Sequence, residues 1–203
     1  MFELPAHLPS ELVPLSWLIG VWEGSGVLDY TIGDESVTRE FGHRISFSHD
    51  GLPHLNYNSY TWLEPAPGTT DEPTPLVTET GYWRLHRSQG EGDPGPGLIP
   101  GLGDRPYASA EEVETLRNPD GGFDIEVTLV HPGGVAELYL GQVKGPRIDL
   151  ATDAVLRTAG AKPYAAATRL YGLVDNHLLW AWDIAALGQD LRTHASGRLA
   201  RVQ

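Results

Sequence analysis

The sequence contains no cysteine, and its single methionine is Met1. Without cysteine the chain can form no disulfide bond, thiolate nucleophile or iron–sulfur cluster, and no zinc or haem site with a thiolate ligand. This composition is compatible with a reducing compartment, where disulfides are rare. Eight histidines are present as candidate metal ligands, but none forms an H-x-H or H-E-x-x-H pair.

Basic residues are also few, because 14 Lys and Arg stand against 27 Asp and Glu, a net charge of −13. Phosphate backbones and anionic lipids are bound through clustered cations, so we expect neither nucleic acid nor a membrane as a partner. No apolar run approaches the ~20 residues of a membrane span. The first residues, MFELP, lack the basic and apolar regions of a signal peptide. We therefore expect a cytoplasmic protein.

Helical patterns are scarce, whereas two-residue alternation recurs along the chain. Apolar Ile125, Val127 and Leu129 alternate with polar neighbours, and residues 41–47 and 178–184 show the same period. Turn residues separate about ten such segments. This pattern predicts an all-β fold, an up-and-down antiparallel barrel of about ten strands, with a sandwich as the alternative. A barrel of this size can hold one small ligand.

The chain length fits a single domain over residues 1–203. Ser10 could cap a short N-terminal helix that ends at Leu18 and places Leu12 and Leu15 on one side. Residues 88–106, SQGEGDPGPGLIPGLGDRP, are rich in Gly and Pro and have no apolar period. We expect them to form a mobile surface loop, inserted in the domain and dispensable for folding.

The most distinctive local pattern is GVWEGSG at residues 20–26. Alternate glycines remove side chains from one face of a strand, which permits a close backbone approach or a sharp bend where a barrel closes. The tryptophan is in step with the glycines, and we expect it to pack in the core at one end of the barrel. The positions that define the pattern are Gly20, Trp22, Gly24 and Gly26.

Five motifs in order resemble the nitrobindin family, haem-binding relatives of the fatty-acid-binding proteins. They are G-x-W-x-G-x-G at 20–26, SHDG at 48–51, ETGYWR at 79–84, LVHPGGVAE at 129–137 and GQDLRTH at 188–194. The resemblance extends from residue 14 to residue 202. The fold of that family, a ten-stranded antiparallel barrel, agrees with the alternation in this sequence.

The resemblance implies a cofactor and an activity. It implies one haem b per chain, isomerisation of peroxynitrite to nitrate, binding of nitric oxide at ferric haem, and a homodimer. It also implies that His194 is the axial iron ligand and the residue on which catalysis depends. Family position and alternation suggest that further residues contact the haem or line its cavity. These residues are Phe47, Tyr57, Val77, Arg169 and Trp180. For Arg169, a structural salt bridge is at least as good an interpretation.

Two positions differ from the family members with well-formed haem sites. Residues 28–32, LDYTI, replace a Tyr-Pro-Thr sequence, and Val77 stands where the family often has a distal histidine. The strand period raises a further point, because a regular strand would bring inside every residue that shares the parity of His194, namely Arg192, Ser196 and Arg198. A bulge around residues 195–197 would remove this conflict.

Other readings of the sequence stay open beside the haem protein. The same barrel could carry a fatty acid or another apolar small molecule, with Arg169 or Arg84 pairing its carboxylate. It could also serve in interaction without any ligand, and a zinc site from scattered histidines is a further alternative. His49 and His131 lie beside turn residues, and we expect them to be turn or surface groups.

Overall fold

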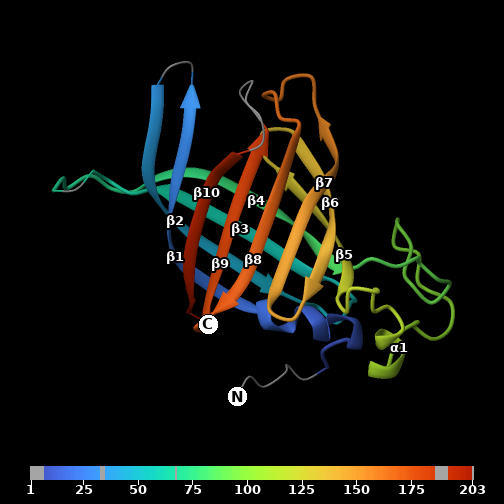
Figure 1. The fold of residues 1–203 in the computed structure, drawn as a ribbon. Helices are drawn as coiled ribbons and strands as arrows, with labels where there is room; N and C mark the ends of the chain where they lie inside the picture. The colour runs from blue at the N-terminus through green and yellow to red at the C-terminus, as the bar shows by residue number, and fades with distance from the viewer. Residues whose placement is uncertain (1–6, 33–34, 67, 186–191, 203) are drawn as a thin grey trace.

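The computed structural model describes residues 7–32, 35–66, 68–185 and 192–202, which form a closed antiparallel barrel of ten strands (Figure 1). The order around the barrel is β1-β10-β9-β8-β7-β6-β5-β4-β3-β2, so each strand pairs with its neighbours in sequence and β1 closes on β10. The predicted fold class is confirmed, and the sandwich alternative is excluded. Within these residues, no helix has the length and apolar character needed to cross a membrane.

The strands alternate inward and outward side chains, as the sequence predicts. The inward Ile125, Val127 and Leu129 of β5 are fully buried, and their polar neighbours face outward. The strand bounds are β1 Gly20–Ile32, β2 Glu35–Ser48, β3 Leu55–Leu63, β4 Thr74–Leu85, β5 Phe123–His131, β6 Val135–Lys144, β7 Arg147–Arg157, β8 Ala166–Val174, β9 His177–Ala185 and β10 Arg192–Arg201.

A short 3-10 helix, η1 (Ser10–Leu18), lies against one end of the barrel, below the strands in Figure 1. Its Leu12 and Leu15 are fully buried, as expected, but Ser10 does not cap the helix. The N-cap position belongs to Pro9, and the Ser10 hydroxyl donates instead to the Ala108 carbonyl at 2.7 Å. Trp22 packs in the core at this end and donates from Nε1 to the Leu18 carbonyl at 2.7 Å.

The glycines of the 20–26 pattern allow β1 and β10 to approach closely. A Cβ on Gly24 would lie 2.2 Å from the Arg198 carbonyl oxygen, and one on Gly26 would lie 2.3 Å from that of Ser196. Both distances are too short for any side chain. The close approach that the sequence suggested is therefore confirmed at the seam that closes the barrel.

Strand β10 contains the expected bulge, one or two residues earlier than predicted. The β9–β10 register shifts between Thr193 and Ala195, so His194 is the additional residue. Ala195 then faces the core and is buried. Gly197 has another role: a Cβ there would lie 2.7 Å from Nε1 of Trp180, so the missing side chain makes room for the indole.

Residues 86–109 contain neither strand nor helix and extend from the barrel, as Figure 1 shows. Their first part is tied down, because Arg87 pairs with Glu11 of η1 at 2.7 Å and with Asp93 at 2.6 Å, and all three side chains are buried. The mobility of residues 88–106 and their dispensability for folding stay predictions, and Leu98 within them is fully exposed.

A short helix that the sequence analysis missed, α1 (Ala110–Glu114), follows this loop. The Ser109 side chain accepts a hydrogen bond from the Glu112 backbone, and the Glu112 side chain accepts one from the Ser109 backbone. This reciprocal capping box has a clear sequence signature, Ser-x-x-Glu.

Candidate functional site

A cavity of about 290 Å³ opens at the end of the barrel away from η1. Its wall is mainly apolar and aromatic, which is the usual character of a small-molecule site. The lining residues come from β1, β2, β3, β4, β5, β9 and β10, and so from both sides of the barrel. They are Leu28, Tyr30, Arg39, Phe41, Thr61, Leu63, Leu76, Val77, Glu79, His131, Trp180, Trp182, His194 and Ala195.

The imidazole of His194 lies between two aromatic rings of this cavity. Its ring centroid is 5.8 Å from that of Tyr30 and 5.8 Å from that of Trp182, which it meets edge to face. Within the described part of the chain, no group hydrogen-bonds to either ring nitrogen. Burial lowers the pKa of His194, and Arg192 lowers it further while Asp29 opposes the change. A neutral imidazole with an uncommitted lone pair is the form that binds a metal.

The structure brings three of the predicted site residues together, since His194, Val77 and Trp180 line this one cavity. Residues 188–191 of the motif that leads to His194 lie outside the described residues. Phe47 does not line the cavity. It packs deeper in the barrel, with its ring centroid 5.4 Å from that of Trp83.

A second, small cavity of about 30 Å³ shares Val77, Glu79 and Trp180 with the first. Tyr57, predicted as a wall residue, lines this small cavity together with Arg169. Its volume is enough for about one water molecule. The predicted set therefore divides between two neighbouring spaces.

Arg169 forms a two-point ion pair with Glu79 on the inner face of the barrel. Its guanidinium donates at 2.5 and 2.9 Å to the two carboxylate oxygens, and the Tyr57 hydroxyl donates to Oε1 at 2.7 Å. Burial alone would raise the pKa of Glu79, but Arg169, His131 and Tyr57 outweigh it and hold the pKa at about 2. Glu79 is therefore ionised at neutral pH, and Arg169 is engaged in the structural salt bridge.

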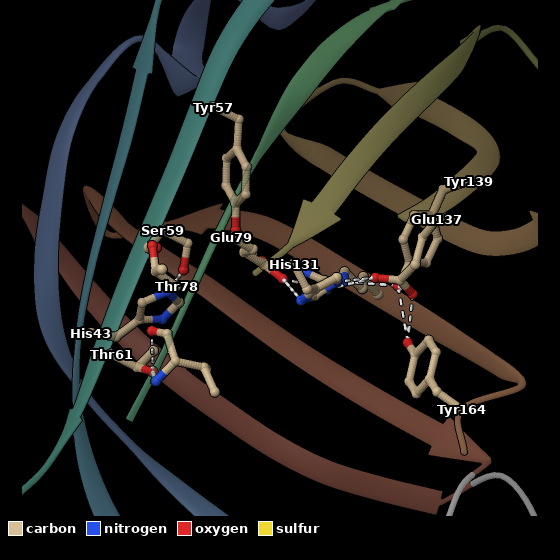
Figure 2. Close-up of polar contacts among 12 residues, drawn as sticks. His43, Tyr57, Ser59, Thr61, Thr78, Glu79, His131, Glu137, Tyr139 and Tyr164 are labelled. Carbon is tan, nitrogen blue, oxygen red and sulfur yellow. Dashed lines mark hydrogen bonds and ion pairs between the residues drawn. The ribbon is translucent and has the colours of Figure 1, made fainter. Parts of the chain in front are cut away.

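His131 links this pair to a second buried carboxylate (Figure 2). Its Nε2 lies 2.6 Å from Oε2 of Glu137, whose Oε1 accepts hydrogen bonds at 2.5 Å from both Tyr139 and Tyr164. Burial would raise the pKa of Glu137, but these donors and Arg169 lower it. The expectation that His131 is a turn or surface group is wrong, because its side chain points inward at the end of β5 and is 19% exposed.

His43 is a third inward histidine, buried beside Trp180 at 4.8 Å between ring centroids. Its Nε2 hydrogen-bonds to the Ser59 hydroxyl at 2.8 Å, as drawn in Figure 2, and its Nδ1 has no partner within the described residues. Its pKa is lowered to about 4, mainly by burial; Glu79 opposes this change and Arg169 adds to it. His43 is thus a neutral imidazole behind the cavity wall.

Residues 11–201 match the family described as "THAP4-like, heme-binding beta-barrel domain". The chain belongs to this nitrobindin family. Several relatives are named peroxynitrite isomerase. That of Clavibacter michiganensis subsp. michiganensis is 70% identical over 202 residues, and that of Leifsonia xyli subsp. xyli is 66% identical over 203, each alignment covering 100% of both chains.

The fold of the nitrobindin barrel also recurs in a solved structure. The crystal structure of Rv2717c from M. tuberculosis superposes with a TM-score of 0.66 over 99% of this chain and 100% of that one. The two sequences are 24% identical, so this comparison shows the fold alone. It supports a barrel of the same architecture over the full chain.

The nitrobindin resemblance assigned no role to Arg39 or Glu79, although both line the cavity. Arg39 is an exposed cation on β2, in step with the inward Phe41. The two-residue alternation could have placed it inside, had the strand been extended by one step. Arg84 was suggested as a partner for a ligand carboxylate. On β4 it has the opposite parity to the inward Glu79, and it pairs with Glu126 away from both cavities.

Proposed function

We propose that this chain binds one haem b in the open cavity through His194 and isomerises peroxynitrite to nitrate. The observation that carries the proposal is the His194 ring, which projects into an aromatic cavity and has no hydrogen-bond partner for its nitrogens among the described residues. Full-length relatives at 66 and 70% identity that are named peroxynitrite isomerase support it.

The residues of the cavity fit a haem. A neutral imidazole is a common axial ligand, and the Tyr30 and Trp182 rings restrict its orientation. Trp180, Leu63 and Val77 supply apolar surface to a macrocycle. Arg39 is the exposed cation of the same cavity, so it is better placed to pair with a propionate than Arg169, which is bound to Glu79.

The chemistry divides between the cofactor and the chain. When bound, ferric haem supplies a Lewis acid toward the oxidant. Peroxynitrite and nitrate have the same atoms and the same charge, so the isomerisation requires no external oxidant or reductant. The chain contributes the axial nitrogen, an apolar wall that restricts water, and polar groups at Glu79 and His131 on one side of the cavity.

The same proposal includes a second ligand, a location and an oligomeric state. We propose reversible nitric oxide binding at the ferric haem, a cytoplasmic location and a homodimer. The absence of cysteine supports a reducing compartment. The net charge of −13 gives no basis for a nucleic-acid partner.

The test is the decay of peroxynitrite and the yield of nitrate with the hemin-loaded protein. Stopped-flow decay should be faster than with an equal concentration of free hemin, with nitrate as the product. Loaded protein that acts no faster than free hemin would contradict the isomerase activity. If hemin produces no spectral change in the protein at all, the carrier of an apolar small molecule becomes the better reading.

A further inference from the structure

The cavity contains a second histidine across the barrel from His194. His131 is the last residue of β5 and His194 lies near the start of β10, and these strands are five positions apart in either direction around the ten-stranded barrel. Both side chains line the 290 Å³ cavity. The two imidazoles therefore face one space from opposite walls.

The carboxylates on either side fix the orientation of His131. A carboxylate only accepts hydrogen bonds, so the 2.6 Å contact with Glu137 places a proton on Nε2. Glu137 is held by Tyr139 and Tyr164, so the imidazole has a rigid support. Nδ1 lies 3.6 Å from Oε2 of Glu79, which is beyond hydrogen-bond distance. The Nδ1 position is therefore left for a ligand in the cavity.

The hydrogen-bond donors around this group disfavour a metal ion. Ligand atoms of Glu79, His131 and Glu137 lie within 4.8 Å of one another, which is close enough for a cation. However, Arg169 donates to both oxygens of Glu79 and approaches Glu137 at 3.5 Å, and tyrosine hydroxyls occupy further acceptor positions. A guanidinium at this point repels a cation. Two carboxylates and one guanidinium sum to −1, a charge that an imidazolium at His131, with a proton on each ring nitrogen, would balance.

We propose that His131 is a ligand-contacting residue of the haem cavity, which in its imidazolium form donates a hydrogen bond from Nδ1–H to a small anion or diatomic molecule bound there. Glu137 and Glu79 are the residues that position it. This inference rests on the proposed haem function and assigns the polar side of the cavity to ligand recognition. It gives peroxynitrite, an anion, a hydrogen-bond donor opposite the axial histidine, although the family's usual distal position is Val77.

The test compares His131→Phe with the wild-type holoprotein, using azide on the ferric form and carbon monoxide on the reduced form. Azide affinity should fall about tenfold, the effect of losing one hydrogen bond to a charged partner. The C–O stretching frequency should rise, because a donor near the bound oxygen lowers it. His131→Gln, which keeps an N–H donor, should restore part of both effects. His86→Phe is the matched control, since His86 pairs with Glu126 on the outer face of the barrel.

The Soret band of each holoprotein distinguishes a failure of the His131 role from a failure of the proposed haem function. A wild-type protein without a hemin-dependent band contradicts the proposed function itself. Normal bands in all variants, together with unchanged azide affinity and C–O stretch in His131→Phe, overturn the role of His131 alone. If His131→Phe does not fold or take up hemin, the smaller His131→Leu is measured in the same way and decides by the same two readouts.

Discussion

Arg169 and Glu79 face each other across the inner surface of the barrel, with their two hydrogen bonds at 2.5 and 2.9 Å. The arginine comes from β8 and the glutamate from β4, so the pair spans the interior rather than two neighbouring strands. The pair lines the small cavity that adjoins the 290 Å³ cavity, so charged groups stand there in place of apolar side chains. Removing one partner leaves the other charged in a buried site.

Glu79→Gln should therefore be strongly destabilising. We expect the free energy of unfolding to fall by about 3–5 kcal/mol, because buried Arg169 loses its two-point partner and keeps only the longer contact with Glu137. Urea denaturation followed by tryptophan fluorescence measures this loss. The matched control is Glu23→Gln, which removes the partner of Arg44 in an exposed ion pair and should cost no more than about 1 kcal/mol. Equal losses in the two variants would show that the buried pair is not a strong contributor.

His43 should make stability fall in mild acid. Its pKa is about 4 in the folded chain against an ordinary value of 6.5, so below pH 6.5 the unfolded chain binds a proton that the folded chain does not. Stability is lost as the pH falls from 6.5 to 4, by about 3 kcal/mol at pH 4. His43→Gln should lack this component, whereas His86→Gln should keep it. Parallel pH profiles for wild type and His43→Gln over this window would contradict the assignment. Glu79 does not affect this comparison above about pH 4.5, because its contribution to the free energy of unfolding is lost only as the pH falls from 4.5 to 2.

Gly24→Ala should disrupt the seam between β1 and β10. A Cβ at this position would meet the Arg198 carbonyl at 2.2 Å, so the two strands must separate. We expect a loss of about 1–3 kcal/mol in the free energy of unfolding, the usual cost of overpacking. Gly133→Ala is the control, because its Cβ would meet nothing within 4 Å and its φ is not positive. Thermal melts of both variants distinguish a steric clash at the seam from a general effect of replacing glycine.

The two-residue alternation of apolar and polar side chains predicted most of the barrel strands and could have predicted more of the cavity residues. The period of residues 41–47 puts Phe41 and His43 of β2 on one face, as the structure has them, and one step further along the same face is Arg39. By the same rule, His131 continues the inward series of Leu129, yet the adjacent Pro132-Gly133 turn favoured a surface reading.

Pairings between distant strands could not be predicted in this way. Parity shows that Glu79 and Arg169 point inward, but 90 residues separate them and only the closed barrel brings them together. The position of the bulge in β10 could not be predicted from the sequence either, because the register of β10 is set by its pairing with β9 rather than by the residues near Gly197. In contrast, the missed α1 had a readable Ser109-to-Glu112 capping signal.

The central claim is that His194 is the axial ligand of a haem in this cavity, and a hemin titration followed by visible absorption tests it most directly. Wild-type protein should give a Soret band distinct from that of free hemin, saturating at one hemin per chain. His194→Ala should bind hemin more weakly and shift the band toward that of unligated hemin, since only apolar burial of the macrocycle remains. His86→Ala, on the outer face, should behave as wild type. A His194→Ala protein with the affinity and spectrum of the wild type would contradict the account.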